Sequence, residues 1–251
     1  MSFTIGTDPE FFMHDTNKFV SAIGRVPGSK EQPCPTSFGN IHADNVALEL
    51  NVNPADSSTA FVSNMKESMQ FADELVTSQG CVVRQDHFVE FEEDELKDPL
   101  AKFAGCDPDW NAYSLTVNNP PCLYSTNYRS AGGHVHIGCD IQMSEIPNLV
   151  KTLDMLIAVP MLEHEQKGRR DLYGKAGSFR VKSYGLEYRT PSNLWTFSPR
   201  GIEWIYEKVK DALSIHKKMK LTSECQFIID GHDVDGAHNL IHKMKLDSFA
   251  V

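Results

Sequence analysis

The chain has 251 residues, of which 41% are hydrophobic and 23% charged, so it can bury a core and shows no compositional sign of disorder. Its formal net charge of −10 argues against a surface for duplex nucleic acid, which normally carries a basic excess. The first residues, MSFTIGTDPEFFMHD, lack the features of a secretory signal, and no apolar run is long enough to span a bilayer.

The N-terminal half predicts strands around one helix. Residues 3–12 and 19–23 predict strands, and the Gly/Pro-rich residues 24–40 predict a loop. A helix is expected over 61–76 with Gly80 as its stop, followed by a strand over 81–91. Residues 41–54, IHADNVALELNVNP, predict the clearest strand, with one face formed by Val46, Leu48, Leu50 and Val52 and the other by Asn45, Ala47, Glu49, Asn51 and Asn53.

Residues 92–130 are irregular and rich in Asp, Asn and Pro. Structureless loops of that length are uncommon unless they are functional. We therefore expect a single domain over 1–251, with a substrate lid or insert at 92–130.

The C-terminal half predicts a strand at GGHVHIG (132–138), which places two histidines on one face. A helix should open at Ser144 and Glu145 and be kinked by Pro160. GRRDLYGKAG (168–177) predicts a basic loop, and residues 178–193 predict two short strands with a turn near 184–185. Helices over 200–218 and 235–246 follow.

These strands alternate polar and apolar residues, whereas a parallel sheet covered on both faces requires continuously apolar strands. The pattern favours an α+β fold, a curved and mostly antiparallel sheet with helices packed on one face and a polar functional face on the other.

Five strand stretches place ionisable residues on that polar face. They are Asp8 and Glu10; Glu49; His134 and His136; Arg180 and Lys182; Glu187 and Arg189. Carboxylates suit hard cations such as Mg²⁺, and arginine or lysine stabilises the charge of a transferred phosphoryl group. The mixture therefore indicates a site that uses a nucleotide and a metal, because a plain zinc site would need the histidines but not the elements that carry arginine or lysine.

No complete P-loop is present. PGSK (27–30) resembles only the tail of one and follows no buried strand, and its Lys30 is kept as a candidate nucleotide contact.

Together these motifs resemble a known group of enzymes. RVKSYGLEYRTPSN and GGHVHIG resemble segments of glutamine synthetase-like enzymes, and with GTDPEFF and ADNVALELN their order resembles the carboxylate–amine ligase branch. More narrowly, the chain is similar to phage-encoded amidoligases of the COOH-NH2 ligase family. Its first motif carries Asp8 where many members of the superfamily carry Glu.

The resemblance implies a glutamine synthetase-like fold and an ATP-dependent ligase that joins a carboxylate to an amine through an acyl phosphate. It implies Mg²⁺ or Mn²⁺ ligands at Glu10, Glu49, His134 and Glu187, with Asp8 nearby. Arg180 and Arg189 would hold the γ-phosphate and the acyl phosphate, with Glu49 also in a catalytic role. Contacts to nucleotide or substrate are implied for His136, Lys182, Arg169 and Arg170.

Two other classes of function stay open. One is a metal-dependent hydrolase or oxygenase built on His-x-His, although the next glutamate, Glu145, opens a predicted helix instead of following on the strand. The other is an inactive structural or binding protein with the same fold. The expected partners are small-molecule or peptide carboxylates and amines, with no duplex nucleic acid and no membrane. Six scattered cysteines without CxxC spacing favour a cytoplasmic setting. The oligomeric state is open.

Overall fold

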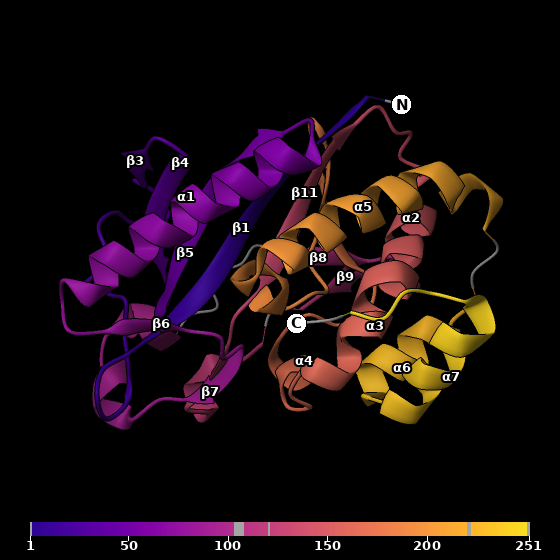
Figure 1. Ribbon diagram of the computed structural model, residues 1–251. Helices are drawn as coiled ribbons and strands as arrows, with labels where there is room; N and C mark the ends of the chain where they lie inside the picture. The colour runs from indigo at the N-terminus through magenta and orange to yellow at the C-terminus, as the bar shows by residue number, and fades with distance from the viewer. Residues whose placement is uncertain (1, 103–107, 120, 220–221, 250–251) are drawn as a thin grey trace.

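Figure 1 shows one broad sheet with α1, α5 and α2 lying across its front. This computed structural model describes residues 2–102, 108–119, 121–219 and 222–249. Within those ranges eleven strands form one sheet in the order β3-β4-β5-β1-β11-β13-β12-β8-β9, with β2 and β6 paired to β1 outside this path. Every pairing between these named strands is antiparallel. The expected α+β class is therefore confirmed.

The strands of this sheet are short at its edges and long at its centre. Their bounds are β1 (Phe3–His14), β2 (Phe19–Val20), β3 (Cys34–Thr36), β4 (Gly39–Asp44), β5 (Ala47–Ala55), β6 (Val82–Arg84), β8 (Asp109–Asn111), β9 (Val117–Asn118), β11 (Gly133–Cys139), β12 (Ser178–Lys182) and β13 (Gly185–Tyr188). A separate two-stranded sheet pairs β7 (Phe88–Glu90) with β10 (Tyr128–Ser130).

The predicted single strand over 41–54 is in fact a hairpin. β4 and β5 pair antiparallel, and Asn45 and Val46 form the turn between them. Asn45 has a φ of 55°, a left-handed conformation that asparagine adopts more readily than most residues. The faces predicted for Leu48 and Glu49 hold within β5, but the reversal brings β4 alongside and sets His42 directly opposite Glu49.

The predicted strand over 81–91 is also divided. β6 pairs with β1, whereas β7 joins β10 in the small sheet. Part of the expected irregular insert is regular as well, because β8 and β9 extend the main sheet beyond β12. Residues 103–107, with Cys106, and residue 120 lie outside the described residues. The other five cysteines are free thiols.

The helices follow the predicted apolar spacing. Their bounds are α1 (Ser58–Thr77), α2 (Ile146–Leu153), α3 (Val159–Met161), α4 (Arg169–Leu172), α5 (Pro199–Ile215), α6 (Glu224–Gly231) and α7 (Val234–Met244). The sequence did not predict α6. Between α2 and α3 the chain makes a π turn over Asp154–Ala158, in which the Val159 amide donates to the Asp154 carbonyl five residues back. Because Pro160 cannot donate, this wider turn takes the place of the predicted kink.

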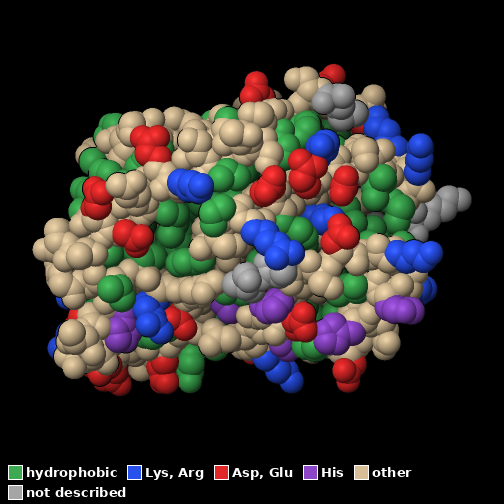
Figure 2. Space-filling view, in the orientation of Figure 1, with side chains coloured by type: hydrophobic (Ala, Val, Ile, Leu, Met, Phe, Trp, Pro, Cys, Tyr) green, Lys and Arg blue, Asp and Glu red, His purple; other side chains and the backbone are tan. Residues whose placement is uncertain are grey.

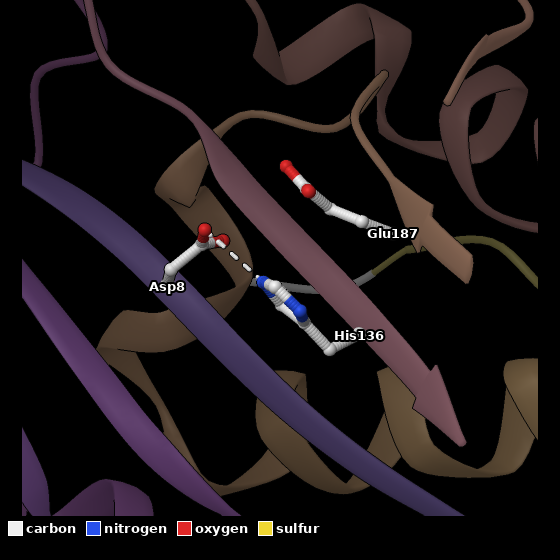
Figure 3. Close-up of side chains that lie close together, drawn as sticks. All are labelled: Asp8, His136 and Glu187. Atoms are coloured by element: carbon white, nitrogen blue, oxygen red, sulfur yellow. Dashed lines mark ion pairs between the residues drawn. The ribbon is translucent and has the colours of Figure 1, made fainter. Parts of the chain in front are cut away.

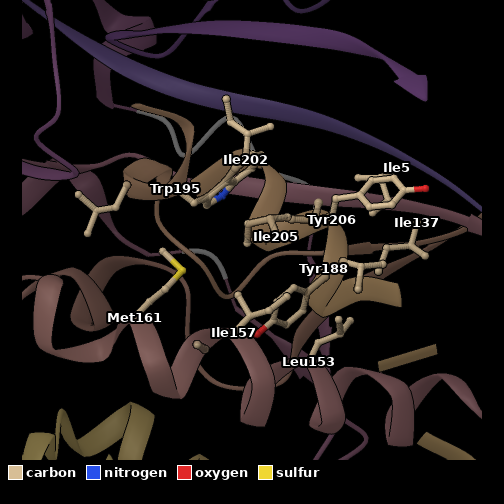
Figure 4. Close-up of a cluster of buried hydrophobic side chains, with 14 of the residues drawn as sticks. Ile5, Ile137, Leu153, Ile157, Met161, Tyr188, Trp195, Ile202, Ile205 and Tyr206 are labelled. Carbon is tan, nitrogen blue, oxygen red and sulfur yellow. The ribbon is translucent and has the colours of Figure 1, made fainter. Parts of the chain in front are cut away.

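One apolar core lies between the sheet and the helices. Figure 4 shows Ile137 and Tyr188 from the sheet packed towards Leu153 and Ile157 of the helical layer, with Trp195 nearby. The core cluster includes residues from Ile5 to Phe249. That continuity supports our proposal of one domain over the chain.

The surface over the helices is mixed. Figure 2 shows acidic and basic side chains interspersed with apolar ones on this face. Among the described residues, no helix is long and apolar enough to cross a membrane.

Candidate functional site

Glu187 lies at the centre of the polar face of the sheet, with its carboxylate almost fully buried. Lys182 Nζ lies 2.8 Å from Glu187 Oε2 and Arg180 Nη1 lies 3.6 Å from Oε1, while Arg189 Nη1 also contacts Oε1. Strand alternation explains the cluster, since Arg180 faces Glu187 across β12 and β13 and the other two lie two residues along. A buried carboxylate is thereby surrounded by cations that suit a phosphate.

Asp8 lies beside both histidines of β11. Its Oδ1 is 3.1 Å from His134 Nδ1. Its Oδ2 is 3.0 Å from His136 Nε2, the contact that Figure 3 shows. Burial acts to raise the pKa of Asp8, but the charges and hydrogen bonds of His136 and His134 outweigh it and hold this pKa well below its ordinary value. For His136, burial acts to lower the pKa, and the carboxylate of Asp8 raises it overall.

A first group suited to a metal ion combines these residues. Asp8, His136 and Glu187 each offer one ligand atom, and the three atoms lie within 4.8 Å of one another (Figure 3). The sequence assigned the metal to His134 and placed His136 near phosphate. In the structure His134 Nδ1 also lies 3.9 Å from Glu187 Oε1, so both rings reach the two carboxylates.

A second group lies on the neighbouring strands. Glu10, Asp44 and Glu49 also offer three carboxylate oxygens within 4.8 Å of one another. Burial, followed by the charges of Asp8, Asp44 and Glu10, raises the pKa of Glu49 well above its ordinary value. Burial also raises the pKa of Glu10, against the opposing charge of His134. Carboxylates gathered with this excess of negative charge fit a hard divalent cation.

Gly132, the residue before β11, allows Glu10 and His134 to lie close to the same backbone. Its amide donates to Glu10 Oε2 over 2.7 Å. A side chain at this position would collide with His134 Nε2, a buried ring nitrogen without a hydrogen-bond partner among the described residues. The glycine before the His-x-His pair therefore allows the histidine and the glutamate to approach the same backbone.

Arg189 is held by more than Glu187. Its Nε lies 3.3 Å from Asp109 Oδ2, and its Cζ lies 5.2 Å from the centre of the Tyr173 ring. The same ring lies 5.5 Å, centre to centre, from the His134 imidazole. The insert and the loop that follows α4 thus both reach the polar face.

Two residues predicted to contact the nucleotide or substrate, Arg169 and Arg170, lie apart from this cluster. Arg169 is fully buried and donates to the carbonyls of Thr190 and Pro191, each over 2.9 Å. Arg170 pairs with Glu165 and donates to Thr190 over 2.8 Å. These bonds tie the basic loop to the chain after β13, so neither arginine is assigned to the proposed site.

Lys30 lies at the edge of the second group. Its Nζ is 3.6 Å from Asp44 Oδ2, and its side chain is 43% exposed. It is close enough to contact a ligand bound to these carboxylates.

Sequence reasoning missed Asp44, Asp109 and Tyr173. Asp44 falls on the face opposite Glu49 in a continuous strand, and only the hairpin turn brings both to one side. The Asp-Asn pair at 44–45 is the signal that could have shown the turn. Asp109 and Tyr173 lie in segments without strand or helix periodicity.

Two pockets flank the ligand groups. One, of about 330 Å³, lies against Glu10 and Asp44 and is also lined by residues of the insert and by Tyr173. The other, of about 260 Å³, lies beside His136 and Tyr184 and over two glycines, Gly6 and Gly138. The site therefore offers space for a ligand on each side.

Sheet, helical layer and polar face together form the glutamine synthetase-like fold that the motifs imply. A solved structure of apo GmaS without ligand matches 98% of this chain and 64% of its own, with a TM-score of 0.51 and 12% identity. At this identity the likeness concerns the fold alone, and the chain spans less than two thirds of the length of GmaS.

A family match is consistent with that fold. Residues 124–227 match the family described as phage phiEco32-like COOH.NH2 ligase-type 2, and this segment contains β11, β12 and β13. The resemblance to phage-type amidoligases is thus confirmed. No curated protein matches the sequence.

Proposed function

We propose that the protein is an ATP-dependent carboxylate–amine ligase that forms an amide bond through an acyl phosphate. The observation that carries this proposal is the placement of two ligand groups for cations next to Arg180, Lys182 and Arg189 on one sheet face. Carboxylates for metal beside guanidinium groups for phosphate are what phosphoryl transfer requires. The family match over 124–227 supports a ligase.

The proposed metal ligands are Asp8, His136, His134 and Glu187 in one group and Glu10, Asp44 and Glu49 in the other. Mg²⁺ or Mn²⁺ bound there would neutralise phosphate oxygens and lower the repulsion between ATP and the carboxylate substrate. The raised pKa values of Glu10 and Glu49 support a cation at the second group, because both carboxylates are buried beside like charges.

The first step joins the carboxylate substrate to the γ-phosphate. A carboxylate oxygen bonds to the γ-phosphorus, the bond from that phosphorus to ADP breaks, and ADP leaves. Arg180, Lys182 and Arg189 are the groups placed to stabilise the charge of the transferred phosphoryl group. Guanidinium groups suit this role because they can hold two oxygens at once.

The second step forms the amide. The protonated amine first gives one proton to a carboxylate. Its nitrogen then bonds to the acyl carbon, the carbon–oxygen bond to the phosphate breaks, and the phosphate leaves with the second proton lost from the nitrogen. The pocket beside Glu10 and Asp44 suits the amine, since an anionic lining attracts a protonated amine. We assign the nucleotide to the other pocket, beside His136 and Tyr184.

Residues 92–130 would shape the amine pocket. Asp109, Asn118 and Leu123 of this insert line it opposite Glu10. We propose that the insert closes the pocket to water, which would otherwise hydrolyse an acyl phosphate. A cytoplasmic setting and a phage origin stay predictions.

The test is a screen for ADP release over pooled metabolites, with and without Mg²⁺. A ligase of this kind sustains ADP release over many turnovers only when a carboxylate and an amine are both present, because the first step alone releases at most one ADP per site. Glu187→Gln should abolish the signal, and Glu203→Gln, an exposed change on α5, should leave it intact. Metal-dependent hydrolysis without ATP would instead favour the hydrolase, and no turnover with any pool would favour the inactive binding protein.

A further inference from the structure

The guanidinium of Arg189 is held on two edges by carboxylates from different parts of the chain. Its Nη1 contacts Glu187, which precedes it by two residues on the same stretch of chain, and its Nε lies 3.3 Å from Asp109 Oδ2 of β8. The side chains of Arg189 and Asp109 are 2% and 11% exposed. Buried charge pairs are screened far less than exposed ones, so the contact with Asp109 strongly constrains the arginine.

Asp109 is itself fixed by its neighbours. Asn118 Nδ2 donates to Asp109 Oδ1 over 2.7 Å and to Ser178 Oγ over 3.2 Å. Asp109 and Asn118 also lie opposite each other on the paired strands β8 and β9, and β8 pairs with β12. One carboxylate oxygen of Asp109 is thus bonded to the hairpin, while the other faces the arginine.

We infer that Asp109 is a positioning residue that fixes the orientation of Arg189 for phosphoryl transfer, an inference that rests on the proposed function. Glu187 contacts the Nη1 edge of the guanidinium, and the Tyr173 ring lies close to its Cζ. The charge of Asp109 on the Nε edge adds a further restraint that opposes rotation of the guanidinium plane. Asp109 acts on phosphoryl transfer through Arg189, and it also lines the pocket proposed for the amine.

Through Asp109, the insert over residues 92–130 contributes directly to the geometry of the site. Asp109 lies within residues 92–130, the segment that the sequence predicts as a lid. The β8–β9 hairpin that carries it belongs to the main sheet, on the far side of β12 from Glu187. Rigid sheet elements hold catalytic geometry more closely than loops do, so the hairpin supports the arginine directly.

The experiment is a double-mutant cycle between Asp109→Asn and Arg189→Lys. Asp109→Asn keeps the side-chain volume but removes the charge facing Nε. We expect kcat to fall about 10- to 100-fold, the range for a small misplacement of a catalytic group, with the KM for ATP within about twofold of wild type. In the Arg189→Lys background the same change should cost less than about twofold, because the group that it positions is already altered.

Asp140→Asn, an exposed change just beyond β11, is the matched control and should leave kcat unchanged. Asn118→Ala is the second variant, since it removes only the support at Oδ1. Asn118→Ala should lower kcat less than Asp109→Asn does. In the Arg189→Lys background it should cause little further loss of kcat. Additive losses in either cycle, or a kcat for Asp109→Asn within about twofold of wild type, would overturn the positioning role.

Crystal structures of wild type and Asp109→Asn separate this inference from the proposed function. We expect the guanidinium of Arg189 to rotate or shift by about 1 Å or more in the variant, a displacement large enough to impair catalysis. An unmoved arginine would refute the inference even if the enzyme proves to be a ligase. A wild type without ADP release in any pool would refute the proposed function, and the position of the arginine would still decide whether Asp109 fixes it.

Discussion

Glu10 and Glu49 lie directly opposite each other on β1 and β5, and each residue is only 8% exposed. Two buried carboxylates at this spacing repel each other unless a cation lies between them or one of them is protonated. Asp44 adds a third carboxylate to the group.

The first prediction concerns metal binding and stability. Mg²⁺ or Mn²⁺ at about 100 times its Kd should stabilise the protein by about 2.7 kcal/mol for each ligand group that it fills, which raises the Tm by roughly 5–10 °C per group at this size. Glu49→Gln should raise the metal-free Tm by about 2–4 °C, because it relieves roughly 1 kcal/mol of repulsion. It should also lose about half of the metal-induced increase, as one of two ligand groups is impaired.

Thermal unfolding across a metal titration measures both effects. Glu203→Gln on the exposed face of α5 controls for the loss of one negative charge. An unchanged metal response in Glu49→Gln would show that this group binds no metal.

The second prediction concerns Glu187. Glu187→Gln should reduce ATP turnover at least about 100-fold, since an amide is a much poorer ligand for Mg²⁺ than a carboxylate of nearly equal volume. The variant should fold but be less stable, because Arg189 and Lys182 lose their shared buried partner. ADP release and circular dichroism test these outcomes. Near wild-type turnover would remove Glu187 from the site.

The third prediction compares the two histidines. Both rings lie near Asp8 and Glu187, so His134→Ala and His136→Ala should each raise the Mn²⁺ concentration for half-maximal rate by about 10-fold or more, and excess Mn²⁺ should restore part of the rate. Arg189→Lys should instead lower kcat at every Mn²⁺ concentration, with little change in the Kd for ATP. A histidine variant with an unchanged Mn²⁺ dependence would show that its ring is not a ligand.

The fourth prediction concerns acid stability around the buried basic loop. Burial acts to raise the pKa of Glu165, but Arg170 and Arg169 outweigh it and lower this pKa to about 2. The folded pKa is below the ordinary 4.5, so the stabilisation from Glu165 is complete above pH 4.5 and is lost as the pH falls towards 2. The amount is on the order of 3 kcal/mol.

His87 adds to the same trend at higher pH. Burial, with the charges of Arg169 and Arg170, lowers its pKa to about 4 against the pull of Glu165. Its Nε2 accepts a hydrogen bond of 2.8 Å from the Gln166 amide, which the protonated ring cannot do. Stability should therefore fall as the pH falls from 6.5 to 4 and fall further below 4.5. Urea unfolding from pH 2 to 8 measures both losses.

His87→Gln keeps a possible acceptor and should flatten the loss between pH 6.5 and 4. His242→Gln, on α7, is the control and should leave the profile unchanged. A wild-type stability that does not change between pH 7 and pH 4 would contradict the assignment of His87 as a buried, neutral acceptor.

Much of the site could be predicted because strand parity is local. The alternation in β1, β11, β12 and β13 put Asp8, His136, Arg180 and Glu187 on one face before any pairing was known. The antiparallel register then set Asp8 opposite His134, and Glu187 opposite both His136 and Arg180. The helices α1 and α5 were predictable for the same reason, since the 3.6-residue spacing of their buried residues is visible in the sequence.

The parts that were missed depend on tertiary contacts. A turn inside the predicted strand over 41–54 changes which residues share a face with Glu49, so Asp44 and His42 went unrecognised. Asp109 reaches Arg189 only because β8 pairs with β12 at the edge of the sheet. The sequence of the three residues in β8 does not predict this pairing. Conversely, Arg169 and Arg170 looked like ligands for phosphate because the sequence does not show the buried carbonyls that they bind.

The most direct measurement follows labelled oxygen from the carboxylate substrate into phosphate. Once the screen identifies the two substrates, the carboxylate is labelled at both oxygens and turned over with ATP, Mg²⁺ and the amine, and the released phosphate is weighed by mass spectrometry. Activation as an acyl phosphate requires each phosphate to carry one labelled oxygen, because the oxygen that attacks the γ-phosphorus leaves with it. Unlabelled phosphate, or ADP release that does not need the amine or the carboxylate, would contradict amide formation by this route.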